Sequence, residues 1–461
     1  MVLVLTVVVL QSISFANYAL TTKTTNIIYG SAPYLTFDGG RTRVTNTEAL
    51  LGISLSDGRR FTPTTNNSSD NPIELPVAGQ SFNDIGMLVP RNTNSIALSS
   101  LIGTPYNYWG DDDGDGQGVN GVTATGSLRL SIVDKDNNPV ARNEVLTICK
   151  APYKLTLSNG EGRLTTRYGV PNESRFTAGN ATYYINPNIS SPAICYARPN
   201  LWGSGISAAV WGGGRGFLTQ SVTPSSYYLN FPTTGANNLY FDLDISGVSQ
   251  ALSWAPVSLG GITATMTDST STSVRVTLTG PVATQSQWQS NNPGRIDRLS
   301  LPQVFELVGR DSSGNAVVKY GFKLKQWFVN RGNYESTPSS LSSWCNKIGG
   351  YRVPKVRDLT NATCQGRNSG SWCQGTVGAT PSSPDRNIRR HIGAGFITEW
   401  GVMSTYTGAN FIVSRDRTTS YWTIDIKASG NHFVILLNNG LFSIEEGYNY
   451  HYGLCIYPNT Y

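Results

Sequence analysis

The stretch WCNKIGGYRVPKVRDL, residues 344–359, brings a Trp-Cys pair, a Gly-Gly pair and a short basic run together in a chain otherwise rich in Gly, Ser and Thr. Cys345 stands shortly before the two glycines, and Pro354 separates them from a second helix-like run. Far downstream, the segment GLCIYP at 453–458 places Cys455 between apolar residues, a pattern that predicts a strand. The fold of the last quarter of the chain depends on how these two segments are related.

Length and composition bound the class of protein. A chain of 461 residues is long enough for about three domains, each with its own core. Charged residues make up 14% and aromatic residues 10%, with 48 glycines, which is the balance of a β-rich extracellular protein. The net charge of +6 is mild, and the one basic cluster, RNIRRHI at 386–392, is interpreted as a solvated loop or a helix end. A nucleic-acid partner is therefore not expected.

The N-terminus predicts export. Residues 1–16 form an apolar run that is too short to span a bilayer and ends in small residues at Ala16, although no Lys or Arg precedes the run. They are assigned as a signal peptide, with Asn17 as the first residue of the mature chain. No later segment of the sequence has the pattern of a transmembrane helix. We expect a protein that is secreted or held at a cell surface.

The cysteines agree with export. The chain has six of them, and an even number in an exported protein predicts disulfides in one of many pairings. A metal site would need Cys-x-x-Cys or mixed Cys and His clusters, and neither pattern occurs. The cysteines are Cys149, Cys195, Cys345, Cys364, Cys373 and Cys455, and the three scattered histidines are His391, His432 and His451. The residues alone therefore predict disulfides without fixing the pairing.

Most segments alternate between apolar and polar residues, with turn signals between them. SLRLSIVDKDNNPVARNEVLTI at 127–148 predicts a strand, an Asp/Asn turn and a second strand, and VFELVGRDSSGNAVVKYGFKLKQWFV at 304–329 repeats this plan. RGNYESTPSSLSS at 331–343 is polar and predicts a linker into a last domain. The chain is therefore expected to be mainly β.

Several separated motifs resemble a known family. Four of them are similar to the C-terminal C-type-lectin-like domain of enterobacterial invasin- and intimin-type adhesins. They are WCNKIGGYRVPKVRDLTNA at 344–362, GAGFITEWGVMSTY at 393–406, YWTIDI at 421–426 and HFVILLNNG at 432–440. Two more, YWGDDDGDGQGVNGVTATGSLRLSIVD at 108–134 and YGFKLKQWFVNRG at 320–332, resemble the invasin-type adhesion domain family. The resemblance covers roughly residues 80–458.

The resemblance implies a domain organisation and a pairing of the cysteines. After the signal peptide at 1–16, we expect an N-terminal β region at 17–125, an Ig-like β-sandwich adhesion region at 126–335 and an α+β C-type-lectin-like domain at 336–461. In such lectin-like domains a disulfide ties the first helix to the last strand, here Cys345 to Cys455. Cys364 and Cys373 would then close a local loop, and Cys149 and Cys195 would form a bridge within the upstream sandwich.

The resemblance also implies a function and a kind of partner. It implies a non-catalytic bacterial adhesin that binds a receptor on a host cell or another surface. Sugar-binding C-type lectins hold calcium and a hexose with Glu-Pro-Asn or Gln-Pro-Asp together with Trp-Asn-Asp, and none of these tripeptides occurs here. A protein receptor is therefore favoured over a glycan. Many relatives carry an outer-membrane region that exports and anchors the adhesive part, so we expect a separate export or anchoring partner. No position matches a receptor-binding motif closely enough to assign ligand contacts.

The acidic loop DDDGDGQG at 111–118 is a candidate metal site. Asp111, Asp113 and Asp115 have the spacing of the first half of an EF-hand loop, with Gly at the sixth position. The twelfth position is Val122, so the bidentate Glu of that loop is missing. Two interpretations stay open: a Ca²⁺ site completed by a carboxylate from elsewhere, or a hydrated acidic turn beside a basic neighbour. Calcium is the only cofactor that the sequence suggests.

A carbohydrate-binding module or a glycan-active enzyme is the alternative from another class. No GxSxG, Walker A or HExxH signature occurs. Paired carboxylates for glycoside hydrolysis could come from Asp242 and Asp244 or from Glu399. The first two also fit the polar face of a strand, and Glu399 fits a turn beside Trp400. We therefore predict that the protein is not an enzyme.

The aromatic residues are assigned mainly to the interior. Trp327, Trp400 and Trp422 lie in apolar, strand-like runs and are predicted to be in the core. In GYNYHYG, residues 447–453, three tyrosines alternate with other residues. The alternation favours packing on a sheet, with an exposed face for recognition as the alternative.

Overall fold

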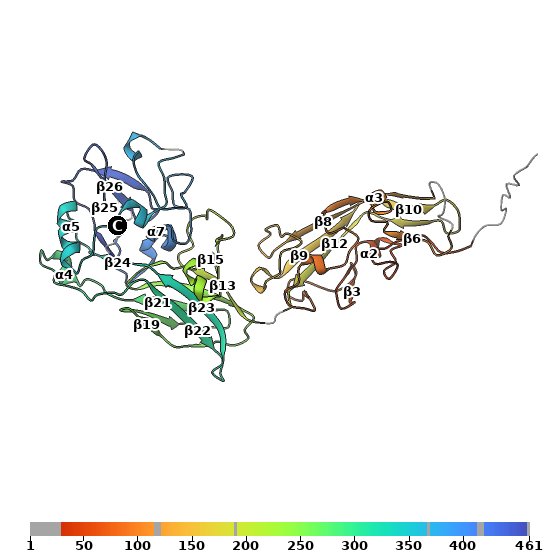
Figure 1. The fold of residues 1–461 in the computed structure, drawn as a ribbon, viewed down its shortest axis with the longest axis horizontal. Coiled ribbons are helices and arrows are strands. Elements are labelled where there is room, and N and C mark those ends of the chain that lie inside the picture. Colours follow the sequence, from red (N-terminus) through yellow and green to blue (C-terminus); the bar gives the residue numbers. More distant parts are fainter. Residues whose placement is uncertain (1–28, 115–120, 189–190, 367–368, 413–418, 459–461) are drawn as a thin grey trace, which may run out of the picture. The chain divides into compact units, whose positions relative to one another are not determined.

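The computed structural model describes five stretches of the chain and places them in two compact units (Figure 1). The described residues are 29–114, 121–188, 191–366, 369–412 and 419–458, and the units are Met1–Asn188 and Ile189–Tyr461. The predicted signal peptide and its cleavage position lie outside the described residues. Within the described stretches, no helix is both long and apolar enough to cross a membrane.

The division between the units differs from the boundaries expected from the sequence. The sequence predicts one Ig-like region over 126–335, but the boundary at 188/189 falls inside this range. Strands β7 (Val122–Thr125) and β8 (Ser127–Val133) flank the expected boundary at 125/126, and both join sheets of the first unit. Backbone pairing thus continues across that expected boundary.

The first unit is built on two main sheets. Its other elements are β1 (Tyr34–Leu35), α2 (Thr47–Leu50), β2 (Ile53–Ser54), β3 (Arg60–Phe61), β4 (Ile73–Glu74), η1 (Phe82–Asp84), β5 (Ser95–Ala97), α3 (Leu98–Leu101), β6 (Trp109–Gly110), η2 (Ile148–Lys150), β9 (Tyr153–Asn159), β10 (Gly162–Thr166), β11 (Glu173–Phe176) and β12 (Gly179–Asn186). The sheet orders are β4-β12-β9-β8-β5 and β11-β10-β7, and two short pairs, β1-β6 and β2-β3, complete the unit. Every second residue of β9 is buried, as expected for a sheet with one face on a core.

Of the hairpin predicted over 127–148, the first strand and the Asp/Asn turn are formed, but the second strand is not. Strand β8 ends at Val133, and Asp134 Oδ1 then accepts the backbone N–H of Asn138 at 2.9 Å, which reverses the chain. Pro139 follows and has no N–H to donate to a ladder, so only one isolated bridge to Val133 forms. β8 pairs instead with β9, further along the chain.

The second unit begins with a β-sandwich. Its elements are β13 (Ala193–Arg198), β14 (Trp211–Gly212), β15 (Gly216–Leu218), η3 (Pro224–Leu229), β17 (Leu239–Ser246), β18 (Ser253–Trp254), β19 (Val257–Leu259), β20 (Ile262–Thr267), β21 (Ser273–Thr279), α4 (Gln285–Gln289), β22 (Gln303–Arg310) and β23 (Ala316–Leu324). A seven-stranded sheet, β14-β15-β13-β17-β21-β20-β19, faces a three-stranded sheet, β18-β22-β23. Phe241 of the first sheet and Phe322 of the second meet edge to face at 6.2 Å. The hairpin predicted within 304–329 is confirmed as β22 and β23.

A mixed α and β region follows the sandwich. Its elements are α5 (Pro338–Lys347), α6 (Val356–Leu359), η4 (Ser371–Cys373), α7 (Phe396–Trp400), η5 (Met403–Thr405), β25 (Ser420–Ile426), β26 (His432–Leu436), β27 (Phe442–Glu445) and β28 (Leu454–Tyr457). A disulfide joins Cys345 of α5 to Cys455 of β28, with 5.5 Å between their Cα atoms, as the resemblance implied. A second disulfide closes the short loop from Cys364 to Cys373. The first helix and the last strand of this lectin-like region are therefore tied together.

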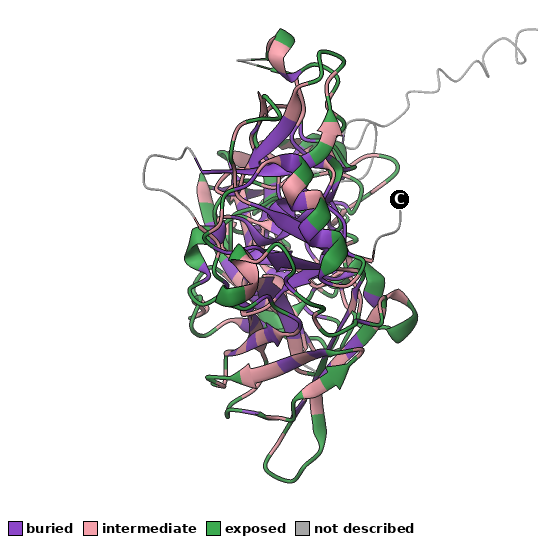
Figure 2. Cartoon of the chain, turned by 90° about the vertical axis from the view of Figure 1, so that its left-hand side faces the viewer, coloured by how far each residue is buried: buried purple, intermediate pink, exposed green. Residues whose placement is uncertain are grey.

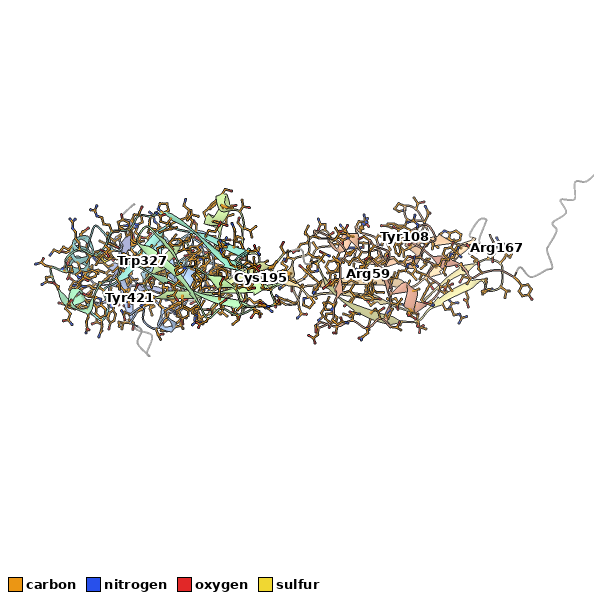
Figure 3. All side chains as sticks on the ribbon, turned by 90° about the horizontal axis from the view of Figure 1, so that it is seen from below. Arg59, Tyr108, Arg167, Cys195, Trp327 and Tyr421 are labelled. Carbon is orange, nitrogen blue, oxygen red and sulfur yellow. A yellow bond between two sulfur atoms is a disulfide. The ribbon has the colours of Figure 1, made fainter. Side chains whose placement is uncertain are left out.

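One small sheet connects the sandwich to the lectin-like region. It contains β16 (Thr234–Ala236), β24 (Gln326–Asn330) and β28 in the order β16-β24-β28. Trp327 of β24 is fully buried, and Figure 3 shows it inside the C-terminal unit together with Tyr421. A Cβ at Gly280 would stand 2.6 Å from the Trp327 ring, so only glycine fits beside this indole.

The two regions share one continuous hydrophobic core, and buried segments run through the middle of the unit in Figure 2. Phe231 of the sandwich and Trp400 of α7 meet edge to face at 4.9 Å. Phe328 of β24 stacks on Phe396 of α7 at 4.2 Å. The boundary expected at 335/336 therefore cuts through a core and removes β24, the strand that pairs with β28.

The remaining two cysteines lie in different units. Cys149 belongs to the first unit and Cys195 to the second. Each is disulfide-bonded, and no described cysteine is a free thiol. The pairing of Cys149 with Cys195 stays a prediction, and the chain passes from one unit to the other between these two residues.

A fragment of residues 336–461 should fail to fold on its own, because it lacks β24 and the aromatic residues that complete its core. A fragment of residues 191–461, with Cys195 replaced by Ser, should fold. Tryptophan fluorescence during urea unfolding measures this: we expect a cooperative transition for the longer fragment and none for the shorter. A cooperative transition for 336–461 would show that the lectin-like region is an independent domain.

Candidate functional site

The three acids considered for catalysis have structural roles. Asp242 and Asp244 lie on one face of β17, where Arg275 Nε donates to Asp242 at 2.9 Å and Arg198 Nη2 lies 3.0 Å from Asp244. Each ion pair crosses the sheet to a neighbouring strand. Glu399 has no exposed surface. Asp242 and Asp244 are thus each engaged in an ion pair, and Glu399 is closed off from solvent.

Glu399 connects α7 to the beginning of the connecting sheet. Its carboxylate accepts the backbone N–H of Thr234 at 3.0 Å and that of Gly393 at 2.8 Å. The hydroxyls of Thr233 and Thr234 donate to it at 2.8 and 2.6 Å, and the Thr233 N–H donates as well. Burial raises the pKa of Glu399, while these hydrogen bonds act in the opposite direction. Glu399 thus braces the chain beside Trp400 through its hydrogen bonds with Thr233, Thr234 and Gly393.

The basic cluster at 386–392 was interpreted as solvated, and for Arg390 this is wrong. Arg390 has no exposed surface, and its guanidinium lies over the Trp211 ring at 4.3 Å. It donates to the carbonyl oxygens of Asn200 at 2.7 Å and Trp202 at 3.0 Å in the sandwich. Burial lowers the pKa of Arg390 to about 10, so it stays charged at neutral pH. Arg390 is therefore a second buried link between the sandwich and the lectin-like region, in addition to Glu399.

An apolar surface is exposed at the end of β25 and in the loop between β27 and β28. Ile426 is 57% exposed, Tyr448 71% and Tyr450 64%, and Ile424 is exposed as well. We call Ile424, Ile426, Tyr448 and Tyr450 the isoleucine–tyrosine face. The prediction that the alternating tyrosines pack on a sheet is wrong for Tyr448 and Tyr450. These residues lie in a loop with a turn at 446–449, so their side chains do not alternate between a buried and an exposed face as in a strand.

A shallow hollow of about 250 Å³ lies beside the two isoleucines. It is lined by Pro338, Ser339 and Ser342 of α5, by Val353, by Thr423, Ile424 and Ile426 of β25, by His432 and by Gly447. The loop that carries Tyr448 and Tyr450 thus begins on the wall of the hollow. The surface combines a concavity with exposed apolar and aromatic side chains.

A layer of aromatic rings lies next to the hollow, with Trp422 buried and His432 and His451 partly buried. The Trp422 ring meets both histidine rings edge to face, with centroids 5.6 Å from His432 and 4.7 Å from His451. Trp422 Nε1 donates to the carbonyl oxygen of Ser336 at 2.6 Å, and Nδ1 of His451 is hydrogen-bonded to the Ser420 hydroxyl at 2.7 Å. Burial lowers the pKa of both histidines, so both are neutral at pH 7. The layer therefore adds no charge beneath the apolar surface.

The acidic loop at 111–118 lies in the first unit and is described only up to residue 114. Asp112 pairs with Arg43, and the Tyr34 hydroxyl donates to it at 3.2 Å. Asp113 Oδ2 accepts the backbone N–H of Ser31 at 2.6 Å. Among the described residues, no three Asp, Glu, His or Cys side chains converge as metal ligands. Asp115 lies outside them, so the calcium site formed with Asp111 and Asp113 stays a prediction.

Comparisons with known proteins found matches among solved structures. No protein-family model and no curated protein sequence matches the chain. Invasin, a bacterial integrin-binding protein, aligns over 74% of this chain and 52% of its own, at 14% identity and a TM-score of 0.36. A C-terminal fragment of intimin, solved with the intimin-binding domain of the translocated intimin receptor, aligns over 74% of this chain and 94% of its own, at 12% identity and a TM-score of 0.30. In structure, the chain is similar to invasin and intimin.

The similarity has limits. This chain spans about half the length of the invasin structure. A Bacteroides ovatus protein of a mixed-linkage glucan utilization locus, SGBP-B in complex with a heptasaccharide, also aligns over 56% of this chain and 70% of its own, at 12% identity and a TM-score of 0.15. These identities and TM-scores are low, and what the chain binds has to be inferred from its own residues.

Replacing Glu399 by Gln should lower the free energy of unfolding by about 2–4 kcal/mol, because the amide NH₂ would face backbone N–H donors in a buried site. Urea unfolding followed by tryptophan fluorescence measures the change, since Trp109 alone among the ten tryptophans precedes residue 189. Glu446→Gln makes the same change at an exposed position and should stay within about 0.5 kcal/mol. Equal effects of the two substitutions would contradict the role assigned to Glu399.

The calcium prediction has a direct test. Chelation by EDTA is expected to lower the thermal midpoint of unfolding, because an ion bound only to the folded state stabilises it. Asp113→Ala should abolish this sensitivity, whereas Arg43→Gln, which removes the basic neighbour, should keep it. Differential scanning calorimetry measures each midpoint. The same midpoint with and without calcium would leave the acidic-turn interpretation alone.

Proposed function

We propose that the chain is the binding part of a secreted or surface-attached bacterial adhesin and that it acts without catalysis. We infer that it binds a protein receptor on a host cell or another surface through the isoleucine–tyrosine face. The observation that carries this proposal is the exposure of two isoleucines and two tyrosines together with a hollow, on a region closed by a disulfide.

Exposed aromatic and aliphatic side chains of this kind are suited to binding. Tyrosine is enriched among the residues that contribute most to protein interfaces, since its ring buries a large area and its hydroxyl can still form a hydrogen bond. Tyr448 and Tyr450 expose most of their surface, and Ile426 more than half. Exposed apolar side chains next to a concavity are typical of an interaction site. A partner that covers them would gain the hydrophobic contribution of their burial.

The rigidity of the support favours affinity. Binding is weakened by the cost of ordering the groups at an interface, and a preformed surface reduces this cost. Strand β25 carries the isoleucines and pairs with β26, while Trp422 of the same strand is fixed by its hydrogen bond to Ser336. The disulfide from Cys345 to Cys455 closes the region on the side of α5. The strand that presents Ile424 and Ile426 is thus held in place before a partner arrives.

The chemistry of the face favours a protein over a glycan. A sugar site needs polar groups that pair with hydroxyls beside an aromatic platform, whereas the isoleucine side chains have no polar atom. The lectin tripeptides that hold calcium and a hexose are missing from the sequence. A carbohydrate-binding module is the second candidate, because the Tyr448 and Tyr450 rings could stack on sugars.

Replacing Tyr448 and Ile426 by Ala should weaken binding to epithelial cells by roughly 30-fold or more, the effect expected when interface residues worth about 2 kcal/mol are truncated. Flow cytometry with the labelled full-length chain measures the apparent Kd. Tyr168→Ala removes a tyrosine from the first unit that is also exposed, and this variant should bind like the wild type.

The same assay tests the class of receptor. Trypsin treatment of the cells should abolish binding, and enzymatic removal of their glycans should leave it intact. Unchanged binding of the Tyr448→Ala/Ile426→Ala variant would sink the proposed face. Saturable binding to sugars on a glycan array, lost in that variant, would instead support the carbohydrate-binding module.

A further inference from the structure

A groove lies where the sandwich meets the lectin-like region. Its volume is about 490 Å³, and it shares no lining residue with the hollow beside the isoleucine–tyrosine face. Its walls come from the start of the connecting sheet, from the link between β23 and β24, from α6 and from the segments at 377–380 and 393–395. The groove is thus a composite of both regions of the C-terminal unit.

Two cations line this groove. Lys325, between β23 and β24, and Arg357, in α6, are both exposed. Neither forms an ion pair or a side-chain hydrogen bond with another described residue. The one acid in the lining, Asp358, is buried, and its carboxylate is bound by Arg352 Nη1 at 2.6 Å and by the Lys355 N–H at 2.7 Å. The acid of the lining therefore does not neutralise the charges of Lys325 and Arg357.

Hydrogen bonds fix the backbone that carries both cations. The Lys325 N–H donates to the carbonyl oxygen of Thr233 at 2.7 Å, and Thr233 is itself a hydrogen-bond donor to the buried Glu399 carboxylate. At the beginning of α6, the Val356 N–H donates to Asp425 Oδ2 at 2.7 Å, which fixes the turn that carries Arg357. Since each backbone is anchored to a buried or paired group, the charges are presented by a preformed surface.

We propose that this groove is a second ligand site, which binds an acidic peptide segment with a carboxylate between Lys325 and Arg357. Guanidinium groups bind carboxylates through paired, charge-assisted hydrogen bonds, and the ammonium adds a second charge. The Gln326 amide and the Thr380 hydroxyl, in the same lining, can pair with peptide backbone groups, and Val377 offers apolar contact at the rim. The site is independent of what the isoleucine–tyrosine face binds.

Fluorescence anisotropy with the full-length chain and a labelled hexaglutamate peptide tests this site. Wild type should bind hexaglutamate and not hexaglutamine. Lys325→Gln/Arg357→Gln should weaken binding by roughly tenfold or more, as expected for losing charge-assisted hydrogen bonds. Arg129→Gln/Lys154→Gln removes the same net charge from strands β8 and β9 of the first unit and should bind like the wild type.

A steric variant separates the groove from general attraction to a positively charged chain. Val377→Trp fills the rim at a side chain that is 69% exposed, keeps every charge and should also weaken hexaglutamate binding. Tryptophan fluorescence verifies that each variant is folded. Any of three results would overturn the proposal: no binding by the wild type, equal weakening in the Arg129→Gln/Lys154→Gln control, or unchanged affinity of Val377→Trp. Binding of a heparin oligosaccharide but not of hexaglutamate would identify an anionic glycan site instead of a peptide site.

Discussion

The carboxylate of Glu399 is removed from water, so its hydrogen-bonding capacity has to be met inside the protein. Thr233 and Thr234, at the end of the sandwich, meet it together with Gly393 of the lectin-like region. Separating the two regions would break the hydrogen bonds that Thr233 and Thr234 donate to this carboxylate. Arg390 adds the same constraint in the opposite direction, because this cation of the lectin-like region donates hydrogen bonds to carbonyl groups of the sandwich. The two regions therefore form one unit.

This constraint also shapes the two surfaces proposed as ligand sites. The disulfide between Cys345 and Cys455 closes the lectin-like region, and the connecting sheet joins it to the sandwich. The surfaces left for recognition are built mainly by loops and strand ends between these fixed elements. One is the isoleucine–tyrosine face, supported by the Trp422 layer. The other is the groove with Lys325 and Arg357, where the Lys325 backbone is anchored to Thr233, a hydrogen-bond donor to Glu399. Both surfaces combine a rigid support with side chains free to meet a partner.

The two surfaces use different physical interactions. Burial of isoleucine and tyrosine side chains is driven by the hydrophobic effect. Salts such as sulfate strengthen this effect, because they are excluded from the protein surface. Contacts to Lys325 and Arg357 are ionic and are screened as salt rises, since the Debye length is about 8 Å at physiological ionic strength. A ligand that engages both would combine apolar affinity with electrostatic steering. The salt dependence of binding would then differ between the two contributions.

Local sequence patterns determined much of the architecture. Alternation predicted the hairpin of β22 and β23, and apolar context predicted the buried positions of Trp327, Trp400 and Trp422, because both signals depend on neighbouring residues. The motif around Cys345 implied its pairing with the last strand.

Only the tertiary structure decided which charges are buried and which aromatic residues are exposed. The local sequence predicts Arg390 at the surface, because the carbonyl groups to which it donates lie 188 and 190 positions away. Glu399 likewise accepts hydrogen bonds from residues up to 166 positions away. Tyr448 and Tyr450 alternate as in a strand but lie in a loop. Burial of a charge depends on whether distant backbone groups replace its water, and exposure of an aromatic ring depends on what the rest of the fold covers. Neither quantity is encoded in the spacing of adjacent residues.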